Sequence, residues 1–468
     1  MAAAAGFVLV EVSPTAAVAL TLLPLIALAV VYLITSGQAV LYAAAIALPM
    51  STLIAAPISG SLYYQDVIAA FALGALIFAK FLGRGRVPPI PRTPVLGWPY
   101  VLFAAAILSA TLRGHYAYGT ALFGQPLRLF FYAVIVAGLV GMTAQKMYRL
   151  LLALFYTGAV LAALVALFLL ATGGSSEGKD AVPLSTGGAR LLGIETSQYC
   201  AGALFLALLN LRLAPGLRAR ALHLSIAAVA TFGVVAGFGR AVYTAVALVG
   251  VLLFITSRRL RRSVLSIVPV AVPFLVVLAI GVNQAAPKFV DSVADRMLSP
   301  PKTDANVQWR LEANRAVLAQ VREQPLFGVG FGRGSEFFIN VEDRITGITT
   351  PQRIEIDQDP HNGYIYLLAG GGLVALGSFV LLLGTFALDA VRRYRRNTDP
   401  IARLIILWVC ATLFVFLLNA ASGPSFGIPE NILAIWALLV LPAVVRPASE
   451  DDSGGAEPQT EADHEIRN

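Results

Sequence analysis

Long apolar stretches dominate this chain and restrict it to one fold class. A run of about 20 apolar residues spans the hydrocarbon core of a bilayer as a helix. Hydropathy predicts about 12 or 13 such runs, because the turn near Gly37 either separates two spans or bends one. The predicted spans are roughly 17–35, 38–57, 66–82, 98–112, 121–142, 148–171, 197–215, 221–238, 240–256, 263–283, 363–387, 402–421 and 430–445. The runs are continuous rather than alternating, which excludes a transmembrane β-barrel.

Composition agrees with an all-α polytopic membrane protein. Of the 468 residues, 58% are hydrophobic and only 13% are charged, which excludes a soluble globular protein. The net charge of +8 lies mostly in loops, where the positive-inside rule accounts for it, so we expect no nucleic-acid partner. Cys200 and Cys410 fall within predicted spans and are interpreted as small buried apolar residues.

Basic clusters set the predicted topology, because all of them fall on the cytoplasmic side when the spans are threaded through a bilayer. They are Arg258, Arg259, Arg261 and Arg262; Arg392, Arg393, Arg395 and Arg396; and the smaller groups Arg84/Arg86/Arg92, Lys146/Arg149 and Arg212/Arg218/Arg220. We expect four parts: a transmembrane bundle at 1–283, a large extracytoplasmic helical loop at 284–362, the last transmembrane helices at 363–445, and a disordered acidic cytoplasmic tail at 446–468.

The extracytoplasmic loop is predicted to contain a helix from a Thr303/Asp304 N-cap to about Gln324. An apolar stripe at helical spacing lies beside Arg310 and would turn it towards the protein or the membrane rather than open water. The stripe consists of Val307, Leu311, Leu318 and Val321.

Glycine alternates with larger residues directly after this helix. Gly328, Gly330 and Gly332 predict a tight loop or a close approach of the backbone to a neighbour, such as a ligand. No Gly-Lys-Ser/Thr follows, and the spacing does not fit a dinucleotide-binding loop.

His361 is the candidate catalytic residue, because it lies where the long polar loop meets the bilayer surface. An imidazole, with an ordinary pKa near 6.5, can exchange protons there, although a purely structural hydrogen-bonded role is an alternative. Asp357 and Asp359 precede it and suggest a metal pair, but two loop carboxylates are more often solvated or paired with arginine. We predict no metal and no other cofactor.

Four arginines on the predicted outer side, where the topology rule disfavours them, are candidate anion-binding residues. They are Arg128, Arg190, Arg240 and Arg310. A guanidinium grips phosphate or pyrophosphate through two parallel hydrogen bonds. The alternative is that these side chains reach lipid headgroups or pair with loop carboxylates.

The combined motifs resemble the O-antigen ligase and polymerase superfamily of polyprenol-dependent glycosyltransferases. The resemblance rests on Gln308-Trp309-Arg310 leading into Pro325–Gly330, and on His361-Asn362-x-Tyr364 opening a helix with Gly370-Gly371-Gly372. It implies a metal-independent, inverting transfer of a glycan from undecaprenyl pyrophosphate, on the outer face of the bacterial cytoplasmic membrane. A glycolipid or glycan supplies the acceptor hydroxyl.

The same resemblance implies a role for each matching residue. His361 activates the acceptor hydroxyl, and Arg240 and Arg310 hold the pyrophosphate of the donor. Arg190 and Arg128 are placed at the site by topology rather than by motif. Besides donor and acceptor, membrane lipids are the expected partners.

Three functions remain open from the sequence. A ligase moves a preassembled glycan to a different acceptor, whereas a polymerase joins lipid-linked repeat units, and both use the same residues. A glycolipid transporter is the third, and it would show charged residues near the bilayer midplane and inverted repeats. Only Arg128 lies well inside a predicted span, and no internal repeat is evident.

Overall fold

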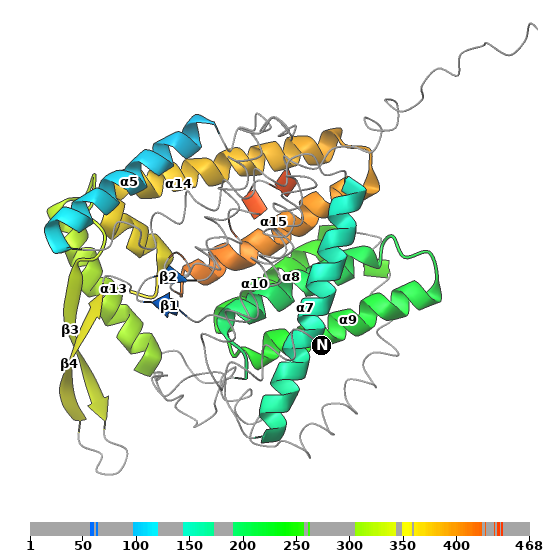
Figure 1. Ribbon diagram of the computed structural model, residues 1–468, viewed down its shortest axis with the longest axis horizontal. Helices are drawn as coiled ribbons and strands as arrows, with labels where there is room; N and C mark the ends of the chain where they lie inside the picture. The colour runs from blue at the N-terminus through cyan, green and yellow to red at the C-terminus, as the bar shows by residue number, and fades with distance from the viewer. Residues whose placement is uncertain are drawn as a thin grey trace, which may run out of the picture.

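Helices form most of the structure, a computed structural model shown in Figure 1. It describes residues 57–59, 62–63, 97–119, 144–172, 191–256, 261–262, 305–342, 349–357, 360–423, 426, 435, 438–439 and 441–442. The bundle helices are α5 (Trp98–Tyr118), α7 (Ala144–Thr172), α8 (Ile194–Asn210), α9 (Leu217–Ala236), α10 (Arg240–Thr256), α14 (Gly363–Arg396) and α15 (Pro400–Ala420). Within the described part, four helices are long and apolar enough to cross a membrane: α7, α9, α14 and α15. The predicted all-α membrane fold is confirmed.

Each bundle helix overlaps a predicted span, and α10 coincides with the span at 240–256. The predicted spans at 17–35, 66–82, 121–142 and 263–283 lie outside the described residues, as do all but the last residue of the span at 38–57, most of the span at 430–445 and the whole tail. A short hairpin of β1 (Pro57–Ser59) and β2 (Leu62–Tyr63) interrupts the helical pattern near the N-terminus.

The core of the bundle lies where α7, α8 and α15 meet. Trp408 of α15 is 2% exposed, and its indole nitrogen donates to the carbonyl of Gly202 in α8 at 2.8 Å. Gly202 also permits the close approach of α7, because a Cβ there would lie 2.9 Å from the Phe155 ring. Phe155 of α7 stacks on Tyr199 of α8, with ring centroids 4.3 Å apart. Close-packed aromatic rings therefore fix three helices against one another.

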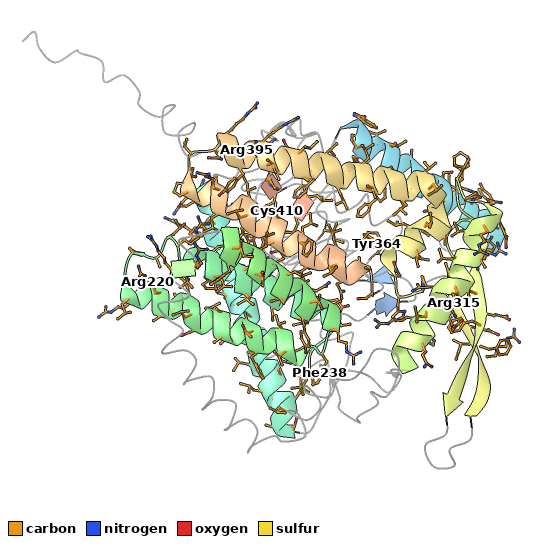
Figure 2. All side chains as sticks on the ribbon, turned by 180° about the vertical axis from the view of Figure 1, so that it is seen from behind. Arg220, Phe238, Arg315, Tyr364, Arg395 and Cys410 are labelled. Carbon is orange, nitrogen blue, oxygen red and sulfur yellow. The ribbon has the colours of Figure 1, made fainter. Side chains whose placement is uncertain are left out.

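The bundle has two chemically different ends. Arg220 at the start of α9 and Arg395 at the end of α14 lie on one side of the molecule, away from Arg315 (Figure 2). Both belong to the clusters predicted to face the cytoplasm. Arg315 belongs to α13 (Ala305–Glu323), the helix of the predicted extracytoplasmic loop. The fold thus separates the basic clusters from the loop helix.

We expected a helical loop, but the structure shows that the loop is only partly helical. The predicted helix is present as α13, but it is followed by an antiparallel hairpin of β3 (Gly334–Glu342) and β4 (Thr349–Asp357). Gly334 pairs with Asp357 at one end of the hairpin. The signal was present in the sequence, since Ile354 and Ile356 alternate with charged residues at the period of a strand.

The packed face of α13 differs from the predicted stripe. Ala313 and Val317 are fully buried, whereas Leu311 and Leu318 are 51% and 37% exposed. The hairpin explains the difference, because α13 packs against β3 and α14. Gln320 joins the two elements by donating to the carbonyl of Gly334 at 2.9 Å. The small residues of α13 therefore face the protein and its leucines do not.

Candidate active site

His361 occupies the turn that leads from the hairpin into α14, and its backbone is strained. Its φ of +52° lies in the left-handed region that non-glycine residues seldom adopt. The next residue, Asn362, is the N-cap of α14, and its side-chain oxygen accepts from the amides of Tyr364 and Ile365 at 3.1 and 3.2 Å. The cap fixes where α14 begins and hence where His361 lies.

Trp309 of α13 packs against the imidazole of His361. Its ring lies edge-on to the ring of His361, with centroids 4.8 Å apart and planes at 84°. Phe337 of β3 lies against the same indole at 5.8 Å. Helix, hairpin and the start of α14 therefore converge on His361. Two motifs that are far apart in the sequence become neighbours.

Arg310, the residue after Trp309, reaches the end of α15. Its Nη1 donates to the carbonyl of Ser422 at 2.7 Å, just beyond the last turn of that helix. A cation is favourable there, since the C-terminal end of a helix carries partial negative charge. Tyr364 ties α14 to the same turn, because its hydroxyl donates to the carbonyl of Leu417 at 2.8 Å. Arg310 and the first turn of α14 are thus both bonded to the end of α15.

Arg240 is the first residue of α10, which packs against α15 and α8. The preceding turn is rigid. Phe238 adopts a φ of +49°, and Ser197 of α8 donates to the carbonyl of Val234 at 2.9 Å. Phe238 lies at the end of the α9–α10 pair that is nearer to α13 and farther from Arg220 (Figure 2). Helix α10, which begins at Arg240, packs against α15, and Arg310 is bonded to the end of the same helix.

Two predicted site residues cannot be placed. Arg128 and Arg190 lie outside the described residues, as does Asp359. Asp357 is the last residue of β4. The structure thus brings His361 to the segment of α13 that bears Arg310, and Arg240 begins a helix that packs against α15.

The alternating glycines lie close to neighbouring backbone atoms, as predicted. Part of this neighbouring backbone belongs to α14. This helix is broken at Gly372, which has a φ of 70° and a ψ of −167°. The amides of Val329 and Gly330 donate to the carbonyls of Ala369 and Gly370 at 2.9 and 3.0 Å. Below the break, the amides of Leu373 and Val374 donate to the carbonyls of Pro325 and Leu326 at 2.9 and 3.1 Å. The loop thus replaces the bonds that the helix loses, which a helix in a membrane requires.

Glycine is required at these contacts. A Cβ on Gly328, whose φ is +72°, would lie 2.5 Å from the carbonyl oxygen of Ala369. A Cβ on Gly330, whose φ is +94°, would lie 2.7 Å from the amide nitrogen of Gly114 in α5. We call residues 325–331 the clamp loop. It lies between α5 and the break in α14.

Sequence reasoning missed two residues, Arg113 and Gln198. Arg113 of α5 donates to the clamp loop, although as an outer arginine it carried the same signal as Arg240. Gln198 of α8 is fully buried, and within the described part of the chain neither of its amide atoms has a hydrogen-bond partner. A glutamine in an otherwise apolar span was visible in the sequence.

Comparison with known proteins gives one family. Residues 225–380 match the family model described as O-antigen ligase. The match includes Arg240, Arg310, His361, the clamp loop and the break in α14, and it excludes Arg113 and Gln198. Among curated proteins, none matches this chain.

Proposed function

Because residues 225–380 of this membrane protein match the O-antigen ligase family model, we propose that it transfers a glycan from undecaprenyl pyrophosphate to an acceptor hydroxyl. The proposed site faces the outside of the cytoplasmic membrane. One observation carries the proposal: Trp309 joins the candidate base His361 to the segment that bears Arg310. A base beside a guanidinium is what transfer from a pyrophosphate donor needs.

In the proposed reaction, His361 accepts the proton of the acceptor hydroxyl. The hydroxyl oxygen attacks the anomeric carbon of the donor sugar from the side opposite the leaving group. The bond from that carbon to the pyrophosphate oxygen breaks, the electron pair leaves with undecaprenyl pyrophosphate, and the configuration inverts. No redox change occurs.

Arg310 and Arg240 are proposed to stabilise the charge on the leaving pyrophosphate. The bond to the Ser422 carbonyl holds the guanidinium of Arg310 in place before substrate arrives. Arg190 and Arg128 are proposed, from topology alone, to contribute to the same anionic site. With guanidinium groups in this role the transfer needs no metal, and we expect EDTA to leave turnover unchanged.

Reconstitution tests the function. Purified protein in vesicles receives undecaprenyl-pyrophosphate-linked glycan, with and without a candidate acceptor glycolipid, and products are resolved by size. Transfer of the glycan as one block onto the acceptor is expected. A ladder on the carrier lipid would instead show a polymerase. Movement of intact glycolipid across the bilayer without a new bond would show a transporter.

The role of His361 is tested by substitution. His361→Ala should lower turnover by roughly 10²-fold to 10⁴-fold, the usual range for a general base, and leave donor binding intact. His115→Ala, which changes a histidine of α5 outside the site, should retain turnover. Near-normal turnover in His361→Ala would show that the base lies elsewhere.

A further inference from the structure

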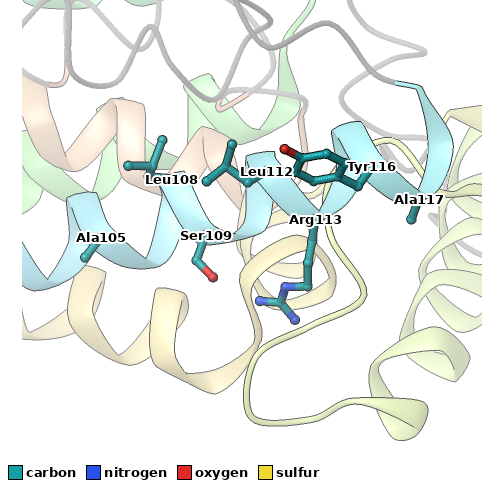
Figure 3. A pocket seen from close by; sticks show the side chains of 7 residues that line it. All are labelled: Ala105, Leu108, Ser109, Leu112, Arg113, Tyr116 and Ala117. Atoms are coloured by element: carbon teal, nitrogen blue, oxygen red, sulfur yellow. The ribbon is translucent and has the colours of Figure 1, made fainter.

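Arg113 joins the first half of the bundle to the clamp loop. Its Nη1 donates to the carbonyl of Gly328 at 2.6 Å, and its Nη2 donates to the carbonyl of Phe327 at 2.8 Å. The guanidinium also lies 5.9 Å from the centroid of the Phe327 ring. Figure 3 shows its side chain leaving α5 towards the segments packed beneath it. One planar fork therefore fixes two consecutive peptide units.

The surroundings of Arg113 on α5 favour these bonds. It lines a groove along the helix with apolar neighbours, among them Leu108 and Leu112, which are 44% and 40% exposed (Figure 3). Apolar side chains offer the guanidinium no hydrogen-bond acceptor, whereas two carbonyls of the clamp loop accept from Nη1 and Nη2. The attachment is therefore favourable for both partners.

The fixed peptide units are the ones that enter the break in α14. Gly328 directly precedes Val329 and Gly330, whose amides bond the freed carbonyls of Ala369 and Gly370. The amide of Phe331 then donates to the carbonyl of Ala110 at 3.2 Å, again on α5. Arg113 thus holds the clamp loop at its entry to the break, and the backbone of α5 holds it at its exit.

Both halves of the proposed site end at this clamp. The clamp loop follows α13, which carries Trp309 and Arg310. The first segment of α14 runs from the turn at His361 to the break at Gly372. The relative position of base and guanidinium therefore depends on how the loop sits in the break.

We propose that Arg113 is a positioning residue for the transfer reaction. It holds the clamp loop so that His361 and Arg310 keep the separation that the reaction needs. This inference rests on the proposed function, but Arg113 lies outside the family match at residues 225–380 and neither the family nor the motifs assign it. A shift of about 1 Å in a catalytic group can cost about 10²-fold in rate.

The test compares variants of the full-length protein in vesicles, with undecaprenyl-pyrophosphate-linked glycan as donor and the acceptor at saturation. Arg113→Ala should lower kcat by about 10²-fold with little change in the KM for the donor. Arg113→Lys keeps the charge but loses the fork, and it should remain roughly 10-fold below the wild type. Arg315→Ala, which removes an exposed arginine of α13, should match the wild type.

Added guanidinium ion separates positioning from general damage. At millimolar concentrations it should restore part of kcat in Arg113→Ala and none in His361→Ala. If Arg113→Ala does not accumulate as folded protein, the kcat of Arg113→Lys decides. Wild-type kcat in Arg113→Ala or in Arg113→Lys, or a loss in Arg113→Ala that guanidinium does not restore, would overturn the inference. An inactive wild type would instead contradict the proposed function.

Discussion

His361 shows how much a single residue depends on its immediate neighbours. Its left-handed backbone costs free energy that the surrounding structure must supply, of order 1–3 kcal/mol for such a conformation. Asn362 supplies part of it by capping α14. The edge-on contact with Trp309 then fixes the imidazole. The cap and the ring thus both contribute to placing the imidazole of His361.

Removing the cap should weaken the structure that holds His361 in this conformation. Asn362→Ala should lower the free energy of unfolding by about 0.5–2 kcal/mol, because two amides of the first turn lose their acceptor. Asn362→Asp should retain most of the stability, since aspartate is an equally good N-cap. Denaturant unfolding of the detergent-solubilised protein measures both. Equal stability of the alanine variant and the wild type would show that the cap is unimportant.

Gln198 should have the opposite effect on stability. Both amide atoms of this fully buried side chain have no partner within the described residues, and such groups cost about 1–3 kcal/mol. Gln198→Met keeps the volume and removes the polar atoms, so its free energy of unfolding should rise by a similar amount. Gln320→Met, which removes bonds to Gly334 and Ser335, should instead lower stability. Destabilisation by Gln198→Met would mean that the amide is hydrogen-bonded.

Residues near the site differed in how readily the sequence predicted them. His361 was proposed because a histidine stands where a long polar loop meets a predicted span, and Arg310 because an arginine is disfavoured on the predicted outer side. Both signals can be read from positions along the chain. Arg113 was not found, although it lies on the same predicted side. Its partners are the carbonyls of Phe327 and Gly328, and a backbone carbonyl leaves no mark in the sequence.

At the level of elements, α14 consists of two helical segments that meet at Gly372, and the clamp loop forms hydrogen bonds with both segments. The segment before Gly372 carries the site and the segment after it carries the basic end. The glycines at the break differ from those farther along the same helix. A Cβ on Gly370 would collide with the buried ring of Phe331, whereas a Cβ on Gly377 would meet nothing within 4 Å.

Alanine substitutions in α14 should therefore have opposite signs. Gly370→Ala should destabilise by about 1–3 kcal/mol, because Phe331 is trapped between α5 and Tyr366 and cannot yield. Gly377→Ala should stabilise by up to about 1 kcal/mol, the helix propensity of alanine over glycine. Thermal unfolding of the matched pair measures both. A loss of stability in Gly377→Ala equal to that in Gly370→Ala would contradict the account of the break.

The junction between α13 and the hairpin should respond to acid through the ion pair of Glu323 and Arg333. Arg333, just before β3, binds Glu323 at the end of α13 at 2.6 Å, and this hydrogen bond holds the pKa of Glu323 below its ordinary value of 4.5. A lowered folded pKa means that the pair stabilises the fold above pH 4.5 and that this contribution is lost as pH falls through the folded pKa.

Amide hydrogen exchange at the start of β3 measures this response. Exchange in the wild type should accelerate, relative to Glu323→Gln, only when pH falls below 4.5. An equal pH dependence in the two proteins would show that the pair contributes nothing. Because Glu323 is exposed, the effect should be small and should diminish with added salt.

Elements were predicted well where the signal is local. Apolar runs located every bundle helix, since a span is defined by its own hydropathy, but α5 and α14 extend past their predicted ends into polar residues. The β3–β4 hairpin was missed although Ile354 and Ile356 alternate with Arg353 and Glu355, because the loop was interpreted as helical throughout. The break in α14 could not be read as a break, since Gly370-Gly371-Gly372 acquires its meaning only from the loop that fills it.

The whole molecule is polarised from one end to the other. Arg220 and Arg395 mark one end, and the hairpin and α13 mark the other (Figure 2). By the positive-inside rule we expect the first end to face the cytoplasm and the proposed site to face the outside. The same rule, applied to the predicted spans and the loops between them, predicted that Arg220 and Arg395 lie on one side.

Sidedness can be measured with single cysteines. In a background with Cys200→Ala and Cys410→Ala, Arg315→Cys should react with a membrane-impermeant maleimide in intact spheroplasts. Arg395→Cys should react only after the membrane is permeabilised. The reverse pattern would place the site in the cytoplasm, and equal labelling of both positions in intact cells would contradict a membrane-spanning arrangement of α14.

The clamp loop also has a consequence for biosynthesis. Of these three segments, in the proposed orientation, α5 enters the membrane first, the clamp loop crosses to the outside next, and α14 is made after both. The carbonyls of Ala369 and Gly370 find their donors only in a loop that has already been translocated. The order of synthesis therefore suits the fold, because a helix that cannot complete its own hydrogen bonds leaves the ribosome after the segment that completes them.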